Sequence, residues 1–172
     1  MEHIFNICLY SLFWMLIVSS VPKIINMKYF LQLVSEYDFL PKPFLIIYGI
    51  TLPFAEISGA ILLMMTEYIL IGSGLIFLLL VSFTIGVTYM IANGKETTCG
   101  CYGKLLDVKV GKLTLLKITF LLIANIVIVF GQNYFQVEFE IPLFLTGLAL
   151  TFMILLFEKI WNNYKINVEL LN

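Results

Sequence analysis

Stretches without an acidic or basic side chain constrain this sequence more than any other feature. Five of them stand out: residues 3–22, 43–55, 68–94, 118–137 and 141–157. A helix that crosses a bilayer needs about 20 largely apolar residues. The chain is 61% hydrophobic and 12% charged, whereas a soluble domain averages about half apolar and a quarter charged. We therefore expect an all-α fold, an integral membrane helical bundle.

Helix length decides how many times the chain crosses the membrane. The break between the second and third spans rests on Thr66-Glu67 alone. One helix over residues 44–92 would be far longer than a hydrocarbon core of about 30 Å requires. The first span lacks a basic start and a small-residue cleavage site, so we expect it to be retained. The sequence predicts a single transmembrane domain over residues 1–172 with five spans, at residues 4–21, 44–65, 68–92, 113–131 and 141–160.

The segment between the first span and Pro41 has its own periodicity. Its apolar residues recur at helical spacing: Ile24, Met27, Phe30, Leu31, Val34 and Tyr37. The pattern predicts an interfacial amphipathic helix that lies on the membrane after the first span. The alternative is an irregular loop packed against the bundle.

The basic residues are all lysines, ten in number. With five helices all ten fall on one side, together with the loop between the third and fourth spans. The positive-inside rule assigns that side to the cytoplasm and the N-terminus to the outside. We therefore expect a multi-pass protein of the plasma (inner) membrane, with the bilayer as its first partner and no nucleic-acid partner.

Two of the three cysteines lie one residue apart in that loop, in Cys99-Gly100-Cys101-Tyr102-Gly103. Their Cα atoms are at most about 7 Å apart, and a disulfide requires about 4.4–6.8 Å. The ring therefore closes only if the backbone folds at the glycine between the cysteines, which accepts positive φ without a steric penalty. Gly103 gives a second flexible point, and a strained ring of this kind is readily reduced.

Redox exchange and metal binding compete as uses of this pair. Lys95 and Lys104 favour the thiolate form that attacks disulfides. Two thiolates can hold Cu(I), but zinc prefers four ligands. The loop has no further Cys or His, and Cys8 belongs to the opposite end of the first span. We therefore assign no metal site and expect Cys99 and Cys101 to be the reactive residues, with Gly100, Tyr102 and Gly103 as the supporting loop.

One carboxylate, Glu56, falls inside the second span, three residues after Pro53. An ionised carboxylate near the bilayer centre costs at least about 2.5–3.5 kcal/mol, so Glu56 should face the bundle interior, protonated or strongly hydrogen-bonded. It is a proton-coupled group, or part of a cofactor site, or a neutral carboxyl bonded to a neighbouring helix through Ser, Thr or the carbonyl freed by Pro53. The sequence does not establish a cofactor. A quinone bound near Glu56 is the cofactor that the sequence leaves open.

An ordered series of short motifs runs along the chain: Lys23 after the first helix, Tyr37-x-x-Leu-Pro41, Leu52-Pro53 with Glu56, and the Cys-Gly-Cys-aromatic-Gly loop. On this series, from about Phe13 to Val129, the chain resembles the MauE/DoxX group of redox-associated membrane proteins, MauE in particular. Tyr102 stands where the family usually has Phe. The resemblance implies a four-helix core followed by one C-terminal helix, with Cys99 and Cys101 as the redox pair.

The resemblance implies support of thiol–disulfide chemistry in the cell envelope. For MauE this means methylamine utilisation, in which it serves the maturation of a disulfide-rich dehydrogenase subunit. We expect electron transfer or disulfide maturation, with a thioredoxin-like protein or a cysteine-rich exported substrate as partner; whether the chain is itself an oxidoreductase component stays open. The alternatives are a non-enzymatic assembly or docking subunit and a Cu(I)-handling protein. An exported substrate would place the loop outside, whereas the lysines place it inside.

Overall fold

The computed structural model describes residues 2–36, 41–93, 111–135, 137 and 139–171. Helices make up almost all of this part of the chain, as predicted. They are α1 (Glu2–Ile25), α2 (Met27–Ser35), α3 (Lys42–Met64), the 3-10 turn η1 (Thr66–Tyr68), α4 (Ile69–Ala92), α5 (Lys112–Gly131) and α6 (Ile141–Leu171).

Five helical segments within the described residues are long and apolar enough to cross a membrane, which confirms the predicted number. They are Glu2–Ile25, Pro43–Met64, Thr66–Ala92, Leu113–Gly131 and Ile141–Tyr164. The turn η1 separates α3 from α4 where the Thr66-Glu67 break predicted it. The first span is longer than predicted, because α1 continues through Pro22 to Ile25. The structure places Lys23 inside this helix, which corrects the prediction that Lys23 follows it.

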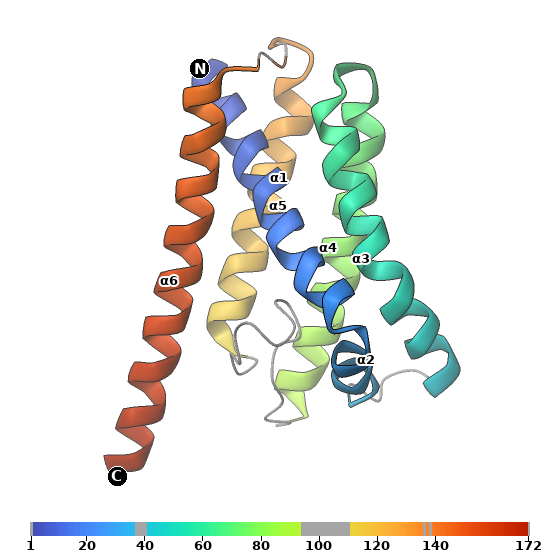
Figure 1. Cartoon of the computed structure of the whole chain (residues 1–172), viewed down its shortest axis with the longest axis vertical. Helices are drawn as coiled ribbons and strands as arrows, with labels where there is room; N and C mark the ends of the chain where they lie inside the picture. The colour runs from blue at the N-terminus through green and yellow to red at the C-terminus, as the bar shows by residue number, and fades with distance from the viewer. Residues whose placement is uncertain (1, 37–40, 94–110, 136, 138, 172) are drawn as a thin grey trace.

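The helix α1 is the central element. It packs against α3, α5 and α6, and α4 packs against both α3 and α5. The helices α1, α3, α4 and α5 therefore form a closed ring of four, while α6 runs along the outside of α1 (Figure 1). Gly147 allows this close approach, because a Cβ there would lie 2.7 Å from Cβ of Tyr10 and 2.8 Å from its carbonyl carbon.

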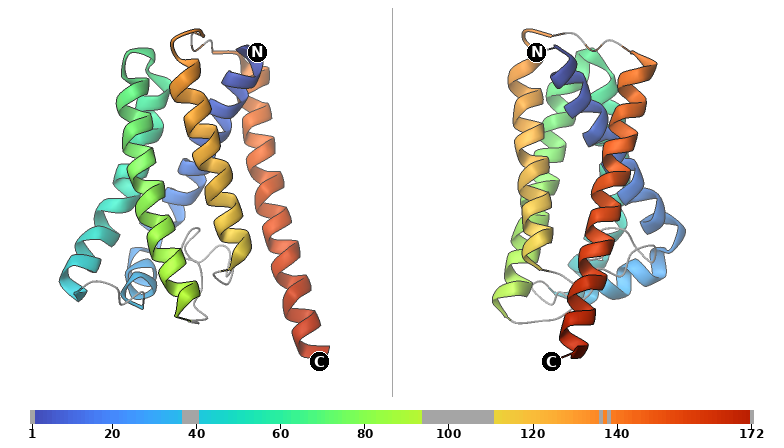
Figure 2. Two further views of the ribbon diagram at one scale, coloured as in Figure 1. Left: turned by 180° about the vertical axis from the view of Figure 1, so that it is seen from behind. Right: turned by 90° about the vertical axis from the view of Figure 1, so that its left-hand side faces the viewer.

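The predicted interfacial helix is present as α2, which lies across the long axis of the bundle beside the C-terminal end of α1 (Figures 1 and 2). It begins at Met27 rather than Ile24, because α1 runs on to Ile25. Phe30 and Val34 pack against Leu45 and Leu52 of α3, so the apolar side of α2 contacts the bundle. Tyr37 lies outside the described residues.

Apolar side chains cover the outside of the bundle as well as its core. The interior contains fully buried residues such as Leu9, Leu63 and Ile76, whereas Leu78 and Phe130 on the outside are 68% and 70% exposed. An apolar surface of this extent is stable against lipid rather than water. The chain is a multi-pass membrane protein.

Candidate functional site

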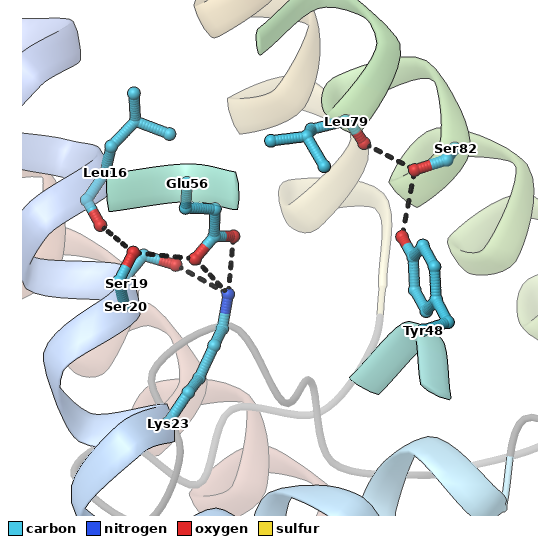
Figure 3. A network of polar contacts seen from close by, with 8 residues as sticks. All are labelled: Leu16, Ser19, Ser20, Lys23, Tyr48, Glu56, Leu79 and Ser82. Atoms are coloured by element: carbon cyan, nitrogen blue, oxygen red, sulfur yellow. Dashed lines mark hydrogen bonds and ion pairs between the residues drawn. The ribbon is translucent and has the colours of Figure 1, made fainter. Parts of the chain in front are cut away.

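A buried ion pair joins α1 and α3 (Figure 3). Nζ of Lys23 lies 2.6 Å from Oε1 of Glu56 and 2.9 Å from Oε2. The two side chains are 2% and 12% exposed. Oγ of Ser20 donates to Oε2 of Glu56 at 2.9 Å, and Lys23 donates to Oγ of Ser19 at 2.9 Å. Both carboxylate oxygens thus accept hydrogen bonds inside the bundle, which offsets the cost of burying them.

The local sequence explains why these groups meet. Lys23 follows Ser19 by four residues and Ser20 by three along the last turns of α1, a spacing that places Lys23 beside both serines on one helix face. The same face packs on α3, where Glu56 follows Pro53 by three residues. Oγ of Ser20 also lies 2.6 Å from the backbone carbonyl oxygen of Leu16, so its single hydroxyl hydrogen is shared between that carbonyl and the carboxylate (Figure 3).

A second buried ion pair joins α5 to α6. Nζ of Lys117 donates to Oε1 and Oε2 of Glu158 at 2.9 and 3.1 Å. The side chains are 9% and 6% exposed. Since α6 packs mainly on α1, this pair is a direct polar link between α6 and α5.

The first ion pair and Lys117 face one cavity of about 60 Å³ inside the bundle. Its polar lining is Ser19, Lys23, Glu56 and Lys117, and the rest is apolar, including Leu52 and Phe83. The volume suits a few water molecules and is far below the 300–1,000 Å³ or so of ligand pockets. Two lysines and a carboxylate around such a space can form hydrogen bonds to water held in it.

Glu56 lies in the bundle interior and accepts a hydrogen bond from Ser20 of a neighbouring helix, but its contact with Lys23 makes it half of an ion pair rather than the neutral carboxyl that was one interpretation of the sequence. The sequence did not reveal its ionic partner Lys23, because the predicted first span ends at residue 21 and leaves Lys23 outside the helix. The helical spacing of Ser19, Ser20 and Lys23 was the available signal. Glu158 was not singled out either, since an acid so near the end of a span is ordinarily solvated.

The predicted reactive loop, Cys99, Gly100, Cys101, Tyr102 and Gly103, lies outside the described residues. Cys8 is half-buried and packs against the core as part of α1. Among the residues that the structure describes, no group of three or more His, Cys, Asp or Glu side chains could hold a metal ion.

The fold and the site define a multi-pass helical membrane protein with two ion pairs buried between its helices. The family model described as "Methylamine utilisation protein MauE" matches residues 1–131. The chain therefore belongs to the MauE family. The match spans α1 to α5, so α6 and its Glu158 lie beyond it. Searches of curated proteins and of solved structures found no match.

Proposed function

We propose that this protein is a membrane thiol–disulfide redox protein that supports electron transfer or disulfide maturation of envelope proteins. The observation that carries the proposal is a Cys-Gly-Cys pair in a chain of the MauE family. The pair belongs to the segment between Ala92 of α4 and Lys112 of α5. The C-terminal end of α4 and the N-terminal end of α5, which flank this segment in the chain, are at the end of the bundle where α2 lies (Figure 1).

A single exchange requires only the two cysteines and a disulfide of the partner. The thiolate of one cysteine attacks a disulfide of a partner protein, forms a mixed disulfide and releases one partner thiolate. The second cysteine then attacks the first, which closes the Cys99–Cys101 disulfide and releases the second partner thiolate. Two electrons pass from the pair to the partner, and the reverse sequence returns them. A thioredoxin-like protein or a cysteine-rich exported protein, including one used in methylamine utilisation, has the required disulfide.

The plasma (inner) membrane is the proposed location, with the cysteines on the lysine-rich side. Without the buried Lys23 and Lys117, eight of the ten lysines still favour that side. The positive-inside rule therefore continues to favour a cytoplasmic loop. In that orientation the protein would exchange electrons with cytosolic thiols and pass reducing power outward through a second carrier.

The test uses a Cys8→Ser background, in which Cys99 and Cys101 are the remaining cysteines. Alkylation of intact membranes with a polyethylene glycol maleimide should show one population without free thiols, which dithiothreitol converts to a doubly labelled one. A single Cys101→Ser or Cys99→Ser substitution should trap a mixed disulfide with a partner.

The double Cys99→Ser/Cys101→Ser variant should lose the maturation of envelope disulfide proteins. Full maturation in that variant would refute the redox function. If changes to Tyr102 and Gly103 then abolished maturation, the result would instead support a non-enzymatic docking subunit. Copper that remains bound after purification under reducing conditions would support Cu(I) handling.

A further inference from the structure

A second hollow lies on the other side of Lys117, between α5 and α6. It is a groove of about 410 Å³, which falls within the range of ligand-binding pockets. Its polar end is the Lys117–Glu158 ion pair, and its walls are almost entirely apolar. We propose that this groove binds a lipid-soluble quinone, with a ring carbonyl at Lys117 and the tail along the apolar wall.

The groove is accessible from the bilayer. Phe120 and Ile123 of α5 are 54% and 55% exposed, and Phe157 of α6 is 57% exposed, although all three line it. Lys117 is five residues into α5, or about 7.5 Å along the helix axis. The groove continues from there to Ile123, deeper in the membrane-spanning helix. A ligand must therefore bring its polar head below the membrane surface.

The charges at the polar end favour an uncharged head. The ion pair is neutral as a unit and both side chains are nearly fully buried. An anionic or a cationic head would meet no net opposite charge there, because the two members of the pair cancel. A charged phospholipid head would also lose its hydration at this depth. A ring carbonyl carries no net charge, so it can lie against the neutral Lys117–Glu158 pair without needing a counter-charge.

The walls favour a flat ring with a hydrocarbon chain. Phe120 and Phe157 contribute aromatic faces or edges to the groove, and aromatic pairs gain about 0.5–1.5 kcal/mol beyond simple burial. Leu113, Leu116 and Ile154 complete an aliphatic lining. The sequence had suggested a quinone near Glu56, but the cavity of about 60 Å³ beside Glu56 is too small for a substituted ring.

The role of the quinone rests on the proposed thiol chemistry, whereas its binding does not. Oxidation of the Cys99–Cys101 dithiol to a disulfide releases two electrons and two protons, and a quinone that takes up both becomes a quinol. Lys117 lines both the groove and the cavity that contains Lys23 and Glu56. The quinone head would therefore contact the residue that separates the lipid-facing groove from the buried site.

The test measures binding of decylubiquinone to the full-length protein in nanodiscs of phosphatidylcholine, by competition with a photoreactive ubiquinone analogue. We expect crosslinks on α5 and α6 near the groove. Ile123→Trp should fill the groove and weaken binding at least tenfold. Ile126→Trp is the matched control on the same helix, since Ile126 lines a separate groove toward α4 and its substitution should leave binding unchanged within twofold.

Two further variants separate the parts of the proposal. The double Lys117→Met/Glu158→Gln variant removes the polar end without leaving an unpaired charge and should weaken binding about tenfold or more. Cys99→Ser/Cys101→Ser should bind decylubiquinone like the wild type, so loss of thiol chemistry and loss of quinone binding are distinguishable. Equal binding by the two tryptophan variants would overturn the proposal, as would stronger displacement of the analogue by phosphatidylglycerol than by decylubiquinone.

Discussion

Breaking the Lys23–Glu56 ion pair is the most direct test of how this bundle tolerates charge in the membrane. Lys23→Met removes the ammonium with little change in length, and Glu56→Gln removes the negative charge while keeping the shape. Each single substitution leaves the other charged group buried without its ionic partner. The double variant leaves neither charge, so the three variants together form a double-mutant cycle.

The geometry sets the expected size of the effect. At 2.6 Å and an effective dielectric constant of about 20, the Coulomb attraction is about 6 kcal/mol. Desolvation of the two ions offsets much of it. Removing one partner of a buried pair costs about 3–5 kcal/mol, because the remaining charge is uncompensated. We expect each single variant to lose stability in that range and the double variant to lose no more than one single variant. The coupling energy is then at least about 3 kcal/mol.

The assay is equilibrium unfolding in mixed micelles with increasing sodium dodecyl sulfate, followed by far-ultraviolet circular dichroism. Lys28→Met and Glu36→Gln are matched controls, since both residues are exposed near the same end of the bundle and should change the free energy of unfolding by less than about 0.5 kcal/mol. Losses that add within about 0.5 kcal/mol in the double variant would refute the reasoning. Control variants as destabilised as the test variants would refute it too.

Three further predictions concern packing, hydrogen bonding and orientation. Gly147→Ala should lower the free energy of unfolding by about 1–3 kcal/mol, because the added Cβ would meet the backbone of α1. The control Gly74→Ala should be neutral or stabilising, because a Cβ there has no atom within 4 Å. Equal losses in the two variants would contradict this. Tyr48→Phe should lower the free energy of unfolding by about 1 kcal/mol, because it removes the 2.9 Å hydrogen bond to Ser82. Adding Ser82→Ala to this variant should lower it no further. A membrane-impermeant maleimide should label the Cys-Gly-Cys pair in lysed cells but not in intact cells, and labelling of intact cells would place the pair outside.

The fold was accessible from the sequence because membrane helices follow a simple rule. In a bilayer every backbone polar group must be satisfied within its own segment, so long apolar stretches predict helices without knowledge of their neighbours. The same rule located the break at Thr66-Glu67 and the amphipathic segment around Phe30. It could not locate the end of α1, because Pro22 and Lys23 together are typical of a helix that leaves the membrane.

The candidate site was less accessible, because ion pairs depend on which helices are neighbours. Glu56 attracted attention by itself, since a carboxylate inside a span is costly wherever it points. Its partner became visible only when α1 and α3 were packed together. The link from Lys117 to Glu158 joins residues 41 positions apart, and no spacing rule connects them.

The sequence by itself determined that this chain is a five-span helical membrane protein with a closely spaced cysteine pair, because hydropathy and residue spacing act locally along the chain. Only the tertiary structure decided that two of its lysines are internal, each paired with a carboxylate from another helix. It also decided that Lys117 lies between a small polar cavity and a lipid-facing groove. The physical reason is that burial and charge pairing are properties of helix packing, which brings distant residues within a few ångströms of each other.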